Sequence, residues 1–245
     1  MQSTLYMKLS SSLDSLHAKA KSNIWLKYFA VFLRIALAAG FFPSGLVKVL
    51  GERFTSLSNN HPMGHYLEAL FHTGYYYTFI GVLQMTAAVL LLIPRTALLG
   101  ALLYFPIILN ICILSLSVRF DGSLITSPLM VLGNLYLLCW DYDRLKFILP
   151  YQRHQFIRSR QIVDRKFPKV FFAVIMITII ALIFTLRNVY SIMPRNTIND
   201  CRAQCKTSKN EDVCKVFCDC IHSKGEPLDK ALEQYNKAVN SLNHK

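Results

Sequence analysis

Charged side chains are scarce in this sequence, and acidic ones are the scarcest. Of the 245 residues, 17% are charged and 53% are hydrophobic, whereas soluble proteins carry about 25% charged residues. The 27 Lys and Arg outnumber the 14 Asp and Glu, which gives a net charge of +13. Because the basic residues gather beside apolar segments, membrane topology and anionic lipid explain the excess, and we expect no nucleic-acid partner.

Several catalytic signatures are absent as well. The sequence contains no CXXC pair, no haem-attachment CXXCH, no nucleotide-binding loop and no HExxH zinc motif. It also lacks the two matching halves that mark many transporters. Residues 1–23 have no apolar core of the kind found in a removable signal peptide. These absences favour an accessory role over an enzyme, although they leave the question of catalysis open.

Five apolar segments predict an all-α membrane protein. They cover residues 27–50, 74–93, 96–118, 124–140 and 169–186. Each is close to the 17–25 residues that cross a bilayer, the fourth only marginally. Short turns make the second, third and fourth antiparallel neighbours. The predicted parts are a terminal segment 1–26, a four-helix bundle 27–149, a basic linker 150–168, a fifth transmembrane helix 169–186 and a small helical domain 187–245.

Basic residues beside these segments predict the orientation. Lys and Arg flank the first segment on its N-terminal side and fill the linker between the fourth and fifth segments. Cytoplasmic loops carry such an excess. We therefore expect a multi-pass protein with a cytoplasmic N-terminus and an extracytoplasmic C-terminus.

One stretch carries the densest set of candidate functional groups. His61, His65, Glu68 and His72 recur at the spacing of one helical face. Such a face could hold a quinone or another small molecule, could bind a metal, or could simply meet water at the membrane surface. We expect no metal. The candidate ligand-binding residues are Lys48, His65, Glu68, His72 and Tyr76.

Polar residues inside the apolar segments are a second set of candidates, since buried polar groups in membranes are costly. Arg34 either reaches the lipid phosphates or pairs with Asp141 or Asp143. Amides within transmembrane segments commonly join helices by hydrogen bonds. The candidate intramembrane polar residues are thus Arg34, Gln84, Asn110 and Asn134, and we expect the three amides among them to join helices.

The C-terminal region carries five of the seven cysteines. Two CX3C pairs place each pair on one face of a helix, so that a helical hairpin would bring Cys201 to Cys218 and Cys205 to Cys214. Disulfides persist in oxidising, extracytoplasmic compartments, which agrees with the expected orientation. Cys220 is left over as a spare thiol. A structural staple, an exchange-active dithiol and a zinc site with His222 are the three interpretations. The pattern resembles the twin CX3C hairpins of small disulfide-stapled domains.

The stretch RIALAAGFFPSGLVKVLG, followed by HPMGHYLEA and three closely spaced segments, resembles the DoxX family of small four-helix membrane proteins. The matching positions in the first segment are Arg34, Gly45 and Lys48. The resemblance covers about residues 28–140 and implies a bacterial inner-membrane protein. Some members are linked to quinone-coupled or membrane oxidoreductase complexes, and others act as assembly factors. The family offers no agreed catalytic residues to carry over.

Two functions follow as hypotheses. The first is a subunit of a membrane redox complex linked to a quinone or to thiols. The second is a non-catalytic accessory, assembly or scaffold subunit whose cysteine tail binds an extracytoplasmic partner. Both place the protein among other membrane or periplasmic proteins.

Overall fold

The structure, a computed structural model, describes residues 15–148 and 163–243. Within these residues it is helical, and the strand-like pairing there is an isolated bridge between Asn23 and Asp164. The all-α fold class is thus confirmed. The helices are α2 (Ile24–Val49), α3 (Pro62–Phe71), α4 (Tyr75–Leu92), α5 (Ala97–Ser117), α6 (Thr126–Trp140), α7 (Tyr142–Ile148), α8 (Lys169–Val189), α9 (Ile198–Cys205), α10 (Glu211–His222) and α11 (Leu228–Asn243).

Four of these helices, α2, α4, α5 and α8, are long and apolar enough to cross a membrane. They match four of the five predicted segments within a few residues, and α8 runs three residues further, to Val189. The fourth predicted segment forms α6, a shorter apolar helix of 15 residues. Helix α7 follows α6 directly, where the sequence suggested only a charged run.

Asn23 determines where α2 begins. Its side-chain oxygen accepts hydrogen bonds from the backbone N–H of Trp25 and Leu26, which would otherwise lack partners at a helix start. Its Nδ2 donates to the carbonyl of Lys166 at 2.8 Å. The described end of the predicted basic linker, residues 163–168, is therefore bound to the start of α2. Most of that linker, and the first 14 residues of the predicted terminal segment, lie outside the described residues.

Helices α2 and α4 approach each other closely through glycine. A Cβ atom on Gly45 would lie 2.7 Å from the carbonyl oxygen of Gly81, and a Cβ atom on Gly81 would lie 2.7 Å from that of Gly45. Small residues allow membrane helices to approach backbone to backbone, where dispersion contacts replace the missing hydrophobic driving force. These two glycines thus set the distance between α2 and α4.

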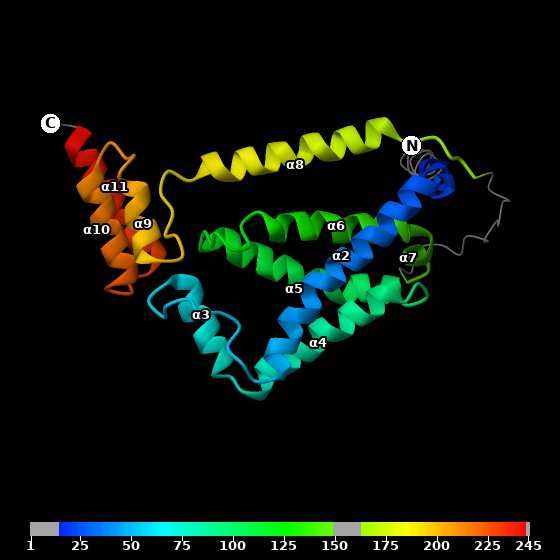
Figure 1. Cartoon of the computed structure of the whole chain (residues 1–245), viewed down its shortest axis with the longest axis horizontal. Helices are drawn as coiled ribbons and strands as arrows, with labels where there is room; N and C mark the ends of the chain where they lie inside the picture. Colours follow the sequence, from blue (N-terminus) through cyan, green and yellow to red (C-terminus); the bar gives the residue numbers. More distant parts are fainter. Residues whose placement is uncertain (1–14, 149–162, 244–245) are drawn as a thin grey trace, which may run out of the picture.

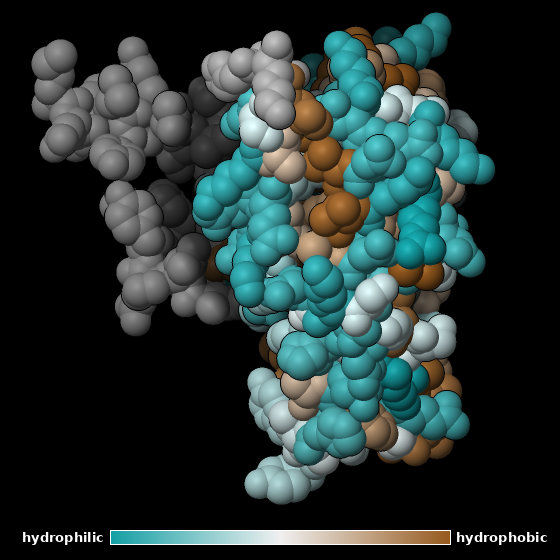
Figure 2. Space-filling view, turned by 90° about the vertical axis from the view of Figure 1, so that its left-hand side faces the viewer, coloured by the Kyte–Doolittle hydropathy of each residue, from teal (hydrophilic) through white to brown (hydrophobic). Residues whose placement is uncertain are grey.

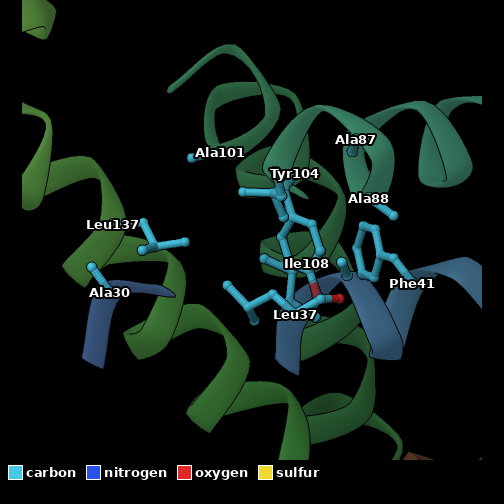
Figure 3. Close-up of a cluster of buried hydrophobic side chains, with 11 residues drawn as sticks. Ala30, Leu37, Phe41, Ala87, Ala88, Ala101, Tyr104, Ile108 and Leu137 are labelled. Carbon is cyan, nitrogen blue, oxygen red and sulfur yellow. The ribbon is translucent and has the colours of Figure 1, made fainter. Parts of the chain in front are cut away.

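Next to this crossing, the bundle core combines aromatic and small side chains (Figure 3). The ring of Phe41 on α2 stacks on that of Tyr104 on α5, with centroids 3.6 Å apart. The Tyr104 hydroxyl donates to the carbonyl of Leu37 at 3.3 Å. Ala87 and Ala88 on α4 are fully buried against this pair. The core thus satisfies its one tyrosine hydroxyl internally, as a lipid-embedded core requires.

Helix α8 runs beside the bundle and is anchored at its two ends (Figure 1). At its start, the rings of Phe171 and Phe172 pack against Phe29 of α2 at 5.7 and 5.6 Å between centroids. Just beyond its end, the Tyr190 hydroxyl donates to the carbonyl of Leu116 on α5 at 3.1 Å. No residue of α8 is buried. Its exposed apolar side chains therefore indicate a lipid environment.

Helices α9, α10 and α11 form a small module at the end of the molecule opposite the N-terminus (Figure 1). Its core contains the four paired cysteines together with Ile192, Phe217, Cys220, Ile221, Leu228 and Ala231. A core of this size is small for independent stability, so covalent cross-links are needed to hold it. We call residues 190–243 the stapled module.

Candidate functional site

Arg34 pairs with Asp141, which is one of the two arrangements expected for this arginine. Its Nη2 donates to Oδ2 of Asp141 at 3.3 Å, and Lys21 lies 3.8 Å from the other carboxylate oxygen. Asp141 is buried. This contact ties α2 to the end of α6, and we assign it a structural role because a buried charge requires a partner.

The three intramembrane amides differ in their surroundings. Asn134 is fully buried and donates from Nδ2 to the carbonyl of Ala101, which joins α6 to α5. Gln84 is buried and accepts from the Ser44 hydroxyl at 3.4 Å, which joins α4 to α2. Asn110 lies on the exposed side of α5. The expectation that Asn110 joins helices is therefore wrong for the described bundle, because its side chain points away from it.

Lys48 is buried in the last turn of α2. At this position a lysine side chain could extend to the membrane surface or share a cavity with Glu68. Its ammonium group donates to the carbonyl and the hydroxyl of Ser44 at 2.9 and 2.8 Å. The same nitrogen lies 4.3 Å from the ring centroid of Phe54. Two oxygens and an aromatic face thus satisfy the charge locally. Lys48 therefore stabilises the fold at this position, while Glu68 pairs with other groups.

Glu68 is held by an arginine that the sequence analysis did not single out. Nε of Arg53 lies 2.7 Å from one Glu68 oxygen, and His72 Nε2 lies 3.0 Å from the other. This set fixes α3 against the loop that precedes it. His65 and Tyr76 are exposed.

The five candidate ligand-binding residues therefore do not converge on one pocket. Lys48 is satisfied within its own helix, Glu68 is paired with Arg53, and the side chain of His72 is 67% exposed. A quinone site needs an enclosed apolar slot with a few polar groups aimed into it. The residues present do not fit that requirement, so we derive no step through a quinone.

Both predicted disulfides are present. Cys201 is bonded to Cys218 and Cys205 to Cys214, with Cα–Cα distances of 5.7 and 5.4 Å. All four cysteines are essentially inaccessible to solvent. The sulfurs of Cys205, Cys214 and Cys218 lie within 4.8 Å of one another, but sulfurs consumed in disulfides cannot act as thiolate ligands. The staple interpretation is the one that this geometry favours.

Cys220 is the spare thiol, and it lies beside a groove. The groove has a volume of about 200 Å³ between α10 and α11 and is almost entirely apolar. Its lining residues are Asp212, Val213, Val216, Phe217, Cys220, Ala231, Gln234, Tyr235 and Ala238. The Cys220 thiol is buried there and donates to Oε1 of Gln234 at 3.5 Å.

The groove lies on the stapled module, and its lining side chains are partly open to solvent. Figure 2 looks at the end of the molecule that carries the stapled module, and this face is largely hydrophilic with a narrow run of hydrophobic residues. Val216, a groove residue, is 56% exposed. On a hydrophilic surface, an apolar groove of this kind is typical of a protein interaction site.

A second region, which the sequence analysis largely missed, is the seam between the bundle and the stapled module. Asn60 donates from Nδ2 to the carbonyl of His222 at 2.9 Å. The rings of His61 and His222 lie 5.8 Å apart, and His61 is completely buried. Burial and the neighbouring His222 ring lower the pKa of His61 from 6.5 to about 4, while the backbone of Arg195 raises it in part.

Two arginines with left-handed backbone conformations also cross this seam. Arg119, at φ 52°, donates to the carbonyl of Ile192 at 2.8 Å. Arg195, at φ 56°, pairs with Asp121 at 3.4 Å. Burial lowers the pKa of Arg119, although its charge lies 4.4 Å from the ring centroid of Tyr190. Non-glycine residues adopt this conformation only where surrounding contacts hold them. These contacts, together with that of Asn60, join the stapled module to the bundle.

These features define a class: a helical membrane protein with a disulfide-stapled module docked on one end of its bundle. No family model and no solved structure matches the chain. The chain is 37% identical over 138 residues to a Bacillus subtilis (strain 168) protein named "Uncharacterized protein YwoB". The match covers 54% of this chain and 87% of that relative. The chain belongs to the same family as YwoB, and the resemblance to DoxX proteins stays a prediction.

Proposed function

We propose that this protein is a non-catalytic accessory or assembly subunit of a membrane complex, and that its stapled module binds an extracytoplasmic protein partner. The observation that carries the proposal is the apolar groove between α10 and α11, with the exposed side chain of Val216 in its lining. The groove lies on a scaffold held by two buried disulfides, so its shape is preorganised for binding.

The groove also indicates the chemistry of the partner. Val213, Val216 and Phe217 offer an apolar floor for one or two hydrophobic anchor residues. Asp212 lies at the rim with its side chain fully exposed, although Lys215 is 3.8 Å away. A partner segment with an apolar anchor next to a basic residue matches this pattern. Central apolar anchors supply most of the affinity, whereas rim charges mainly guide association.

The proposed location follows from charge and from the arrangement of the helices. The N-terminal end of α2 and the stapled module lie at opposite ends of the molecule (Figure 1). Lys and Arg flank α2 on its N-terminal side in the sequence and fill the stretch between α6 and α8, so the positive-inside rule supports a cytoplasmic N-terminus and a periplasmic module in a bacterial inner membrane. The partner is then a periplasmic protein or the outer part of a membrane protein.

A matched pair of variants tests this proposal. Val216→Glu places a charge in the groove, while Leu242→Glu makes the same kind of change at an exposed residue that does not line it. We expect partners co-purified in mild detergent to be depleted by about tenfold or more with Val216→Glu and retained with Leu242→Glu. Equal recovery of the same partners with both variants would contradict the proposal.

The thiol of Cys220 supports a second candidate, a thiol-linked redox role. Cys220 lines the groove as a free thiol. Its thiolate could attack a disulfide of a bound partner, forming a mixed disulfide while the partner's second sulfur leaves as a thiolate. Rapid alkylation followed by a non-reducing gel should then trap a conjugate that Cys220→Ser abolishes. If no conjugate forms while the partner still binds, the redox role is excluded and the accessory role stands.

A further inference from the structure

We propose that His61 and His222 form an acid-sensitive latch that holds the stapled module on the membrane bundle. His61 belongs to the loop before α3, and His222 is the last residue of α10. Their ring centroids are 5.8 Å apart. Adjacent to this pair, Asn60 donates to the His222 carbonyl. The two histidines therefore lie at the seam between the two parts of the protein.

The hydrogen bonds define where each proton is carried. Nδ1 of His61 accepts from the backbone N–H of Met63 at 3.1 Å and so caps the start of α3. Nδ1 is therefore unprotonated, and the proton of the neutral ring is on Nε2. That Nε2 is buried near the backbone of Arg195 and makes no hydrogen bond of standard geometry within the described residues. On His222, Nε2 lies 2.7 Å from the carbonyl of Pro194 and is the proton donor to it.

Protonation of His61 would have two effects, one on α3 and one on the seam. The added proton can go only to Nδ1, where it would abolish the hydrogen bond that caps α3. The charge that results would be buried at the positive end of the α3 dipole, beside His222. The loss of the cap occurs whether the module is docked or released, because His61 and Met63 both belong to the bundle. Burial of the charge beside His222 occurs only when the module is docked, so this second effect is the one that opposes docking.

The charged groups around the pair increase this penalty or leave it unchanged. The segment before α9 contributes Arg195, whose side chain pairs with Asp121. The turn after α5 contributes Arg119 and Asp121, on either side of Phe120, whose ring is 6.2 Å from His61. From the loop before α3, Arg53 is paired with Glu68 on α3, and the nearby His65 of α3 is exposed. No unpaired carboxylate in this set is available to neutralise an imidazolium.

The direction of the pH dependence follows from this arrangement. Docking favours neutral His61, because burial and His222 lower its pKa from 6.5 to about 4. Docking is therefore at full strength above pH 6.5, weakens as the pH falls from 6.5 towards 4, and weakens no further below 4. Each pKa unit is a factor of ten in the equilibrium, so the ratio of docked to released module should fall by roughly fifty- to a hundredfold between pH 7.5 and 4.5.

Protons can reach the pair through a hollow that opens at the seam. The hollow has a volume of about 550 Å³ and is lined by Thr55, Ser56, Leu57, Ser58, Phe120, Asn196, Thr197, Ile198 and His222. His222 is therefore accessible from outside, and His61 is the next ring inward.

Hydrogen exchange of the full-length protein in lipid nanodiscs tests the latch. Protection factors, corrected for the intrinsic pH dependence of exchange, are compared at pH 7.5 and 4.5 for residues 55–63 and 190–197. We expect them to fall by tenfold or more in the natural protein, with protection in α4 and α5 unchanged. His61→Asn keeps a capping oxygen and cannot titrate, so this variant should lose the acid response.

Two further variants keep the test decisive. His65→Gln removes an exposed histidine of α3 and should leave the acid response intact. If His61→Asn does not fold, His222→Gln serves instead and should shrink the response, because one cause of the low pKa of His61 is removed. Seam protection that is equal at both pH values in the natural protein, or a full acid response in His61→Asn, would overturn the proposal.

Discussion

A close contact in the bundle joins two glycines, whereas the core of the stapled module is built around two disulfides. Gly45 and Gly81 bring α2 and α4 together with no side chain between them. In the module, the sulfurs of Cys205 and Cys218, which belong to different disulfides, are 3.8 Å apart. Lipid supplies no hydrophobic drive between helices, so the bundle depends on fit. The module has water around it but too small a core, so it depends on covalent bonds.

Removing a disulfide should have the largest effect, because it should destabilise the stapled module while leaving the stability of the bundle unchanged. The double variant Cys201→Ala/Cys218→Ala opens a cross-link that spans 17 residues. We expect the module to lose about 2–5 kcal/mol, enough to unfold most of it, while the bundle stays folded. Protease digestion in detergent should then remove residues 198–243 and spare α2 to α6. Loss of both regions together would show that the bundle depends on the module.

Adding a methyl group at the contact between Gly45 and Gly81 should lower the stability of the bundle and leave the stapled module unchanged. Gly81→Ala places a Cβ atom 2.7 Å from the Gly45 carbonyl oxygen, where backbone must move to accommodate it. We expect a cost of about 1–3 kcal/mol in unfolding titrations of the bundle followed by circular dichroism.

Gly133→Ala is the matched control for that variant. Its Cβ atom would lie 3.3 Å from Cδ2 of Leu33, the end of a flexible side chain. Because alanine also favours helix over glycine, we expect neutral or increased stability. If both variants lose the same stability, close backbone approach is not what holds α2 to α4.

The smallest expected effect is a difference in stability between variants of two amides in the bundle, Asn134 and Asn110. Asn134→Ala removes the hydrogen bond to the Ala101 carbonyl, whereas Asn110→Ala alters an exposed side chain of α5. Interhelical hydrogen bonds in membrane proteins contribute about 0.6 kcal/mol, up to about 1.7. We expect a loss in this range for Asn134→Ala and almost none for Asn110→Ala, measured by the same unfolding titration. An equal loss for the two would mean that Asn110 has a partner in the membrane.

The sequence predicts best what depends on short spacing. The CX3C pairs lie one helical turn apart, so the disulfide pairing followed from helix geometry and is confirmed. Apolar length likewise located the long helices. It could not show which way Asn110 points, because α5 is apolar on every side and its sequence gives no preferred face.

The candidate site was harder to predict because its contacts are long-range. The seam depends on residues such as Asn60 and His222, which are 162 positions apart. His61 was considered only as a weak member of a helical face, yet it is the cap of α3 and a buried partner of His222. The groove arises from how α10 meets α11, and no short motif in the sequence marks that contact. A capping position before Pro62 was the one local signal for His61.

The anchoring of α8 at its two ends has a consequence for biosynthesis. Domains generally fold as units, N-terminal first, while the chain is still being made. Because α8 buries none of its residues in the bundle, α2 to α6 can complete their packing before α8 is synthesised. The five cysteines of the module follow α8 in the chain, so in the proposed orientation they reach an oxidising compartment only after α8 has been inserted. Maturation should therefore proceed in a fixed order, in which a finished bundle waits as the platform on which the module is oxidised and then docked.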